Sequence, residues 1–209
     1  ALMVVVGGYV RLTRSGLSIV EWDPINGVIP PIGEAAWQAE FAKYQQTPEF
    51  KLINATMTLE GYKRIFYLEW AHRLIARVAG LIVALPLLFF LWKGLIPRRK
   101  AAAYLAVGAL FAFQGFMGWY MVASGLVDRP HVSHFRLTIH LLTALSLLGL
   151  TLWIALGRVY PVGEGVRPRW SAAGLAVLAI IVLQIAYGGR VAGLKAGWVA
   201  NTWPLMLGS

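Results

Sequence analysis

Residues 69–80 read EWAHRLIARVAG and open a long hydrophobic run that ends near Trp92. This stretch places a carboxylate, an imidazole and two guanidinium groups in what otherwise has the composition of a membrane helix. Ionisable side chains within a membrane cost roughly 2.5–3.5 kcal/mol each, so they usually face a polar interior or a bound ligand. On a helix the spacing puts all of these groups on one side, which we expect to point into a helix bundle. They are Glu69, His72, Arg73 and Arg77.

A second apolar stretch carries a matching polar pair. Residues 134–150 read HFRLTIHLLTALSLLGL and hold Arg136 and His140 about one turn apart. We predict that His72 and His140 lie on membrane helices that run in the same direction, each roughly 10–15 Å below the outer surface. Two such histidines are the smallest protein contribution to a bis-imidazole heme site. The alternative is that each imidazole only makes hydrogen bonds between helices.

The composition predicts an all-α integral membrane protein. Of the 209 residues, 58% are hydrophobic and 13% are charged, whereas about 25% charged residues is usual for a soluble domain. The net charge of +10 comes mainly from short loops and helix ends, so it does not indicate a nucleic-acid partner. The chain has no cysteine, which excludes disulfides, zinc–thiolate sites and iron–sulfur clusters built from it.

Hydropathy predicts how the chain crosses the membrane. The expected membrane helices are the end of a first helix at 1–12 and then 61–92, 101–124, 133–156 and 171–191. The loop at 13–60 contains a short amphipathic helix, 34–46, whose aromatic face either covers a ligand or rests on the bilayer. The loops after residues 92 and 156 are basic, which predicts that they face the cytoplasm or the mitochondrial matrix. We expect the sequence to be a piece of a longer protein.

An internal repeat predicts a design in two parts. GGYVRLTRSGLSIVEW (7–22) aligns without gaps with GGRVAGLKAGWVANTW (188–203). The expected architecture is a four-helix transmembrane bundle followed by the first helix of a pseudo-symmetric second bundle. Residues 1–157 would form the first bundle, and residues 158–209 would begin the second one.

Long strings along the chain resemble the heme A synthases of the mitochondrial and alphaproteobacterial type. They are GGYVRLTRSGLSIVEWDPINGVIPP (7–31), EFAKYQQTPEF (40–50), YKRIFYLEWAHRLIARVAGL (62–81), FQGFMGWYMVASGL (113–126), FRLTIHLLTAL (135–145) and GGRVAGLKAGWVANTWPLM (188–206). The resemblance implies two four-helix bundles. It also implies oxidation of the C8 methyl group of heme O to the formyl group of heme A, with heme b as cofactor in the second bundle. The family's Glu-x-x-His motif falls on Glu69 and His72, and its other first-bundle histidine falls on His140.

These residues are our candidates for binding and chemistry. We expect His72 and His140 to bind the iron of the substrate heme. Glu69 would accept a proton or stabilise positive charge near the reacting methyl group; the alternative is an ion pair with Arg73 or Lys63.

Three arginines, each able to form paired hydrogen bonds with a carboxylate, would bind the heme propionates. They are Arg73, Arg77 and Arg136. The alternative is an ordinary anchoring role at helix ends or in pairs with Glu69.

The resemblance also implies partners. They are heme O and heme A, an electron donor of unknown identity, heme O synthase, oxidase assembly factors and the lipid bilayer of a bacterial cell or the mitochondrial inner membrane. Two other functions stay open on the residues alone. One is a b-type cytochrome that only transfers electrons and does not need Glu69, and the other is a heme-delivery or oxidase-assembly protein.

Overall fold

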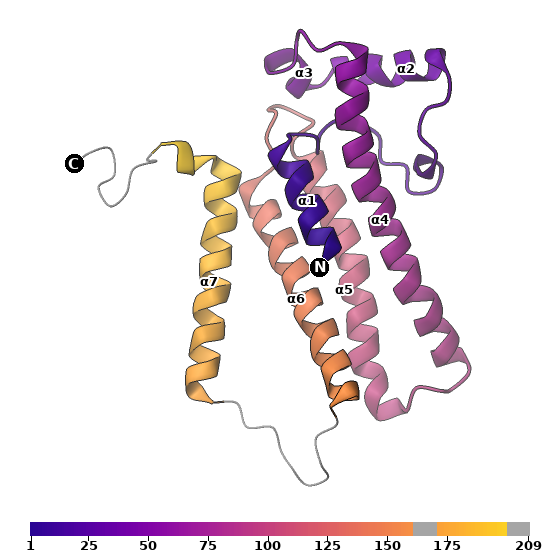
Figure 1. Ribbon diagram of the computed structural model, residues 1–209, viewed down its shortest axis with the longest axis vertical. Helices are drawn as coiled ribbons and strands as arrows, with labels where there is room; N and C mark the ends of the chain where they lie inside the picture. The colour runs from indigo at the N-terminus through magenta and orange to yellow at the C-terminus, as the bar shows by residue number, and fades with distance from the viewer. Residues whose placement is uncertain (161–170, 200–209) are drawn as a thin grey trace, which may run out of the picture. The chain divides into compact units, whose positions relative to one another are not determined.

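All the regular elements are helical in the computed structural model, which describes residues 1–160 and 171–199 (Figure 1). The helices are α1 (Leu2–Leu12), α2 (Glu34–Gln45), α3 (Pro48–Leu52), α4 (Leu59–Trp92), α5 (Arg98–Ala123), α6 (His134–Val159) and α7 (Ala172–Leu194), with short 3-10 turns η1 (Asn26–Val28) and η2 (Ala196–Trp198). Within the described residues, four helices are long and apolar enough to cross a membrane, α4 to α7. The predicted all-α membrane class is therefore confirmed.

The chain divides into two compact units, Ala1–Val132 and Ser133–Ser209. The first contains α1 to α5, and the second contains α6 and α7. The division into bundles at residues 157 and 158 stays a prediction. Much of the second basic loop and the last four residues of the repeat lie in 161–170 and 200–209, outside the described residues.

The predicted membrane helices are present with small shifts in their ends. The short helix α3 was not predicted, because five residues are too few to show a helical period. The residue types at its start are nevertheless typical of a helix N-terminus. The Thr47 side chain accepts a hydrogen bond from the backbone N–H of Phe50, and Pro48 occupies the first turn. Both features favour a helix N-terminus.

The aromatic face of α2 packs against the first turns of α4. Trp37, Phe41 and Tyr44 are buried there together with Tyr62 and Phe66 of α4. Tyr44 stacks on Tyr62 with ring centroids 5.0 Å apart, and burial raises the pKa of Tyr44 above its ordinary value. This is a small extramembrane core, and Figure 1 shows α2 and α3 at the N-terminal end of α4. The aromatic face of α2 therefore packs on α4.

The length of α4 changes the expected depth of His72. The helix has 34 residues, about 51 Å at 1.5 Å per residue, which is well beyond the roughly 30 Å of bilayer hydrocarbon. Counted back from Trp92, the about 20 residues needed to cross the hydrocarbon begin near Arg73. Counted this way, His72 lies at the outer edge of the hydrocarbon, which is shallower than the expected roughly 10–15 Å below the surface. The depth of His72 stays a prediction.

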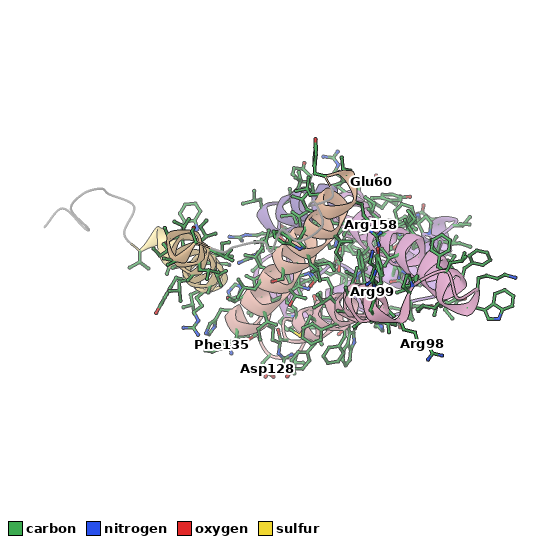
Figure 2. The ribbon with its side chains drawn as sticks, turned by 90° about the horizontal axis from the view of Figure 1, so that it is seen from below. Glu60, Arg98, Arg99, Asp128, Phe135 and Arg158 are labelled. Carbon is green, nitrogen blue, oxygen red and sulfur yellow. The ribbon has the colours of Figure 1, made fainter. Side chains whose placement is uncertain are left out.

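The connection from α4 to α5 is basic and exposed. Lys93, Arg98, Arg99 and Lys100 are all exposed, and Figure 2 shows the Arg98 side chain directed away from the ribbon. Charged side chains in a short connection between two membrane helices remain in water beside the lipid headgroups. The exposure of these residues is what a loop outside the bilayer requires. The side of the membrane on which the loop lies stays a prediction.

The repeat has a counterpart in backbone geometry. Arg14 and Lys195, which occupy equivalent positions in the repeat, have φ angles of 53° and 55°. Among the non-glycine residues that the structure describes, they alone have a positive φ. This conformation is unfavourable for residues with a side chain, so its occurrence at both positions supports the repeat independently of the residue matches.

Candidate functional site

Glu69 lies at the centre of a buried polar cluster in the first unit, and its exposed fraction is 2%. One carboxylate oxygen, Oε2, accepts hydrogen bonds from the backbone N–H of Ser18 at 2.8 Å, the hydroxyl of Ser18 at 2.7 Å and the backbone N–H of Ile19 at 3.0 Å. The other oxygen, Oε1, accepts from Nε and Nη2 of Arg73 at 3.0 and 2.6 Å. Hydrogen bonds from this many donors hold the carboxylate in one orientation.

The side chains that follow Glu69 along α4 bind the backbone of the same loop. Arg73 donates to the carbonyl of Ile19 at 3.1 Å and more weakly to that of Glu21 at 3.3 Å. One turn later, Arg77 donates to the carbonyls of Asp23 at 2.8 Å and Pro24 at 3.0 Å. Residues 18–24 therefore run along α4 from Glu69 towards Arg77.

The loop then turns back at η1. Trp70 Nε1 donates to the carbonyl of Val28 at 3.2 Å, and a Cβ atom added to Gly27 would lie 3.1 Å from Nη2 of Arg77. A glycine at this position lets the turn approach the guanidinium group closely. We call residues 18–28 the α4-bound loop.

These contacts bear on the predicted roles of three residues. Glu69 forms the ion pair with Arg73 that was its alternative role, while Lys63 pairs with Glu60 at 2.6 Å. Arg73 and Arg77 each donate two hydrogen bonds to the backbone of the loop, and Nη1 of Arg77 is buried without a hydrogen-bond partner in the described part of the chain. A catalytic role for Glu69 and propionate binding by the arginines stay predictions.

His72 lies beside a glycine of α1. A Cβ atom added to Gly7 would be 3.1 Å from Nε2 of the imidazole, so the absence of a side chain at residue 7 lets α1 approach that nitrogen closely. Within residues 1–160 and 171–199 the His72 ring, which is partly buried, makes no hydrogen bond. A neutral imidazole without a hydrogen bond keeps the nitrogen lone pair that an iron ligand needs, and the role of His72 as a ligand stays a prediction.

His140 and Arg136 lie one turn apart on α6, and both are partly buried. They belong to the second unit, whereas His72 belongs to the first. That His72 and His140 bind one iron stays a prediction. In the part of the chain that the structure describes, no group of three or more His, Asp or Glu side chains is suited to a free metal ion; a heme iron needs fewer protein ligands.

A cavity of about 320 Å³ lies between the α4-bound loop, α2 and α4. Lys43 donates hydrogen bonds to Glu21 and Glu40, which line this cavity, and its hydrogen bond to Glu40 raises the pKa of Lys43. His72 is not among the lining residues, whereas Arg73 and Arg77 are. The lining residues are Ile19, Glu21, Asp23, Asn26, Gly27, Ile29, Pro31, Ala36, Ala39, Glu40, Phe66, Trp70, Arg73 and Arg77.

Sequence reasoning missed Ser18 and Gly7 as parts of the site. Ser18 is fully buried and donates to Glu69 from a position 51 residues away, a distance that no helical period can reveal. Gly7 is the first residue of the repeated string GGYVRLTRSGLSIVEW. That position was a usable signal, because glycines on membrane helices often mark close helix contacts.

Comparison with known proteins assigns the chain to a family. Curated proteins named heme A synthase are similar to it over nearly its full length: 50% identity with that of Novosphingobium aromaticivorans over 99% of this chain and 62% of the relative, 50% with that of Rhizobium etli over 99% and 57%, and 48% with that of Flavobacterium psychrophilum over 98% and 61%. The chain thus spans about 60% of the length of these relatives. No solved structure matches it. The family model described as COX15-CtaA, cytochrome oxidase assembly protein, matches residues 1–209, and the chain belongs to this family of integral membrane proteins.

Proposed function

We propose that this chain provides the substrate-heme part of a heme A synthase, which oxidises the C8 methyl group of heme O to the formyl group of heme A. The observation that carries the proposal is the identity of 46–50% over 98–99% of the chain with proteins named heme A synthase. Conversion of a methyl to a formyl group removes two hydrogen atoms and adds one oxygen, a four-electron oxidation. The protein must therefore hold the heme edge in place and pass protons and electrons.

The proposal assigns one task to each candidate residue. His72 and His140 bind the iron of the substrate, and Gly7 lets α1 lie close to Nε2 of His72. Arg136 and the unpaired Nη1 of Arg77 bind propionates. In this proposal heme b supplies electron transfer when bound, and no described residue of this chain is assigned to it.

Glu69 has two tasks in the proposal. Its contacts with Ser18, Ile19 and Arg73 support an anchoring task, because they hold the outer loop on α4 next to His72. A negative charge fixed one turn from His72 also stabilises positive charge that develops near the heme edge.

The test is conversion by the intact protein. Purified protein in lipid nanodiscs, given heme O and a reductant in air, is expected to produce heme A, detected by chromatography and mass of the extracted hemes. The matched control is the same protein with heme B, which lacks the hydroxyethylfarnesyl tail of heme O. Bound heme O that is reduced but never oxidised at C8 would instead favour the b-type cytochrome, and failure to bind heme O would reject the proposal.

Gly7→Val is expected to weaken binding of heme O about tenfold or more. The added side chain would meet Nε2 of His72, and overpacking of this kind costs typically about 1–3 kcal/mol. The measurement is a heme titration followed by absorbance.

Gly8→Val is the matched control, because a Cβ atom at Gly8 meets nothing within 4 Å. Both variants raise helix propensity by a similar amount, so the difference between them reports the contact with His72. Equal binding of heme O by the two variants would show that a side chain at residue 7 does not disturb the proposed iron ligand His72.

A further inference from the structure

The turn of the α4-bound loop and the residues after it form an apolar surface that α4 does not cover. Residues 24–32 read PINGVIPPI and contain no charged side chain. Ile25, Ile29 and Ile32 are 79%, 66% and 79% exposed. An uncharged stretch with several exposed isoleucines is unusual for a loop in water, and such a surface commonly marks an interaction site.

Contacts with α4 place this surface at the level of the membrane. The deepest contact is that of Arg77 with the carbonyls of Asp23 and Pro24. Arg77 lies about 6 Å further into the bilayer than Arg73, at 1.5 Å per residue, and the hydrocarbon crossing begins near Arg73. The next turn on the same side of α4 carries the exposed Leu81, so Arg77 and the turn that it binds lie at the outer end of an apolar, exposed side of the span.

Backbone chemistry of the turn is compatible with an apolar medium, where unpaired N–H and C=O groups are costly. The Asp23 carboxylate accepts from the N–H groups of Ile25 and Asn26 at 3.2 and 2.9 Å, and the Asn26 N–H holds the pKa of Asp23 below its ordinary value. Three prolines of this stretch have no N–H to satisfy: Pro24, Pro30 and Pro31. Arg77 donates hydrogen bonds to the carbonyls of Asp23 and Pro24, and Trp70 donates to that of Val28.

We propose that residues 24–32 dip into the outer leaflet of the bilayer, with Ile25, Ile29 and Ile32 in the boundary between headgroups and acyl chains. The occupant of this surface is lipid, because Arg77 holds the turn at the level where the α4 span begins and residues 24–32 carry no charge that would recognise a polar partner. Insertion anchors the outer loop from the lipid side, while Glu69 and the two arginines anchor it from the protein side. This inference does not depend on the proposed function.

The experiment uses the absence of cysteine from the chain. Single Ile25→Cys and Ile29→Cys variants of the intact protein receive a nitroxide label in lipid nanodiscs, and the label's accessibility to oxygen is compared with its accessibility to a water-soluble nickel chelate. Leu81→Cys is the lipid reference. Leu52→Cys is the water reference, because Leu52 is 69% exposed on α3, within the extramembrane part.

Labels at residues 25 and 29 are expected to favour oxygen, as the Leu81 label does, and the Leu52 label is expected to favour the chelate. Chelate access at 25 and 29 equal to that at 52 would overturn the proposal, because the loop would then lie in water. Labels at 25 and 29 that meet neither reagent would also overturn it, because protein would cover the surface. A thermal unfolding midpoint like that of the unsubstituted protein shows that each variant is folded.

Discussion

Replacing His72 with alanine is expected to lower heme A formation at least about 100-fold, because even the loss of a residue that only supports a metal ligand costs about 10–100-fold in affinity or activity. His72 is the candidate ligand that the first unit contributes, and its Nε2 lies beside Gly7 of α1. The measurement is heme A extracted from cells or nanodiscs that contain the variant, normalised to the amount of folded protein. His131→Ala is the matched control, since His131 is exposed and lies outside the helices of the same unit.

A purely structural role for His72 makes a different prediction. If the ring binds iron, the His72→Gly variant should regain part of its heme absorbance when free imidazole is added, because the small base occupies the vacated position. A packing role would not respond to imidazole. Wild-type heme A levels in His72→Ala would contradict the assignment of His72 as a ligand.

Glu69→Ala is expected to lower the free energy of unfolding by about 3–5 kcal/mol, since removing one partner of a buried ion pair leaves the other charge uncompensated. The side chains of Glu69 and Arg73 are 3% and 12% exposed. The variant also leaves the N–H groups of Ser18 and Ile19 without their acceptor. Denaturation of the purified protein measures the loss, and faster proteolysis within residues 13–33 should accompany it.

The control lies on the same helix. Glu60, labelled in Figure 2, pairs with Lys63, and the Glu60 side chain is 75% exposed. Glu60→Ala should therefore cost at most about 1 kcal/mol, the usual limit for an exposed pair. Equal losses in the two variants would contradict the view that Glu69 anchors the loop.

Ser18→Ala separates anchoring by Glu69 from chemistry. It removes one hydroxyl donor to Oε2 and keeps the carboxylate, at an expected cost of about 1.5–3 kcal/mol for a hydrogen bond to a charged group. If heme A formation falls in Ser18→Ala in step with the loss of stability, anchoring explains the need for Glu69. Full activity in Ser18→Ala together with complete loss in a folded Glu69→Gln variant would support a direct chemical task.

The sequence predicted the helices and the polar side of the central one well. The run from Val78 to Trp92 has no charged residue, and the positions of Glu69, Arg73 and Arg77 repeat with the helical period. Both signals come from neighbouring residues, so they can be recognised without any knowledge of the packing. The sequence does not reveal that the first turns of α4, which carry Tyr62 and Phe66, pack against α2. The helical period there reports burial, and it does not distinguish burial against lipid from burial against α2.

By itself the sequence determined the membrane class, the helical segments and the grouping of Glu69, His72, Arg73 and Arg77 on one helix side. Hydropathy and the helical period are properties of neighbouring residues, so a linear reading reveals them. Only the tertiary structure decided what those side chains contact: Glu69 binds Ser18, 51 residues away, and His72 faces Gly7 while the adjacent Gly8 faces open space. Such contacts depend on how segments that are distant in the sequence pack together, and no periodic pattern along the chain predicts that packing.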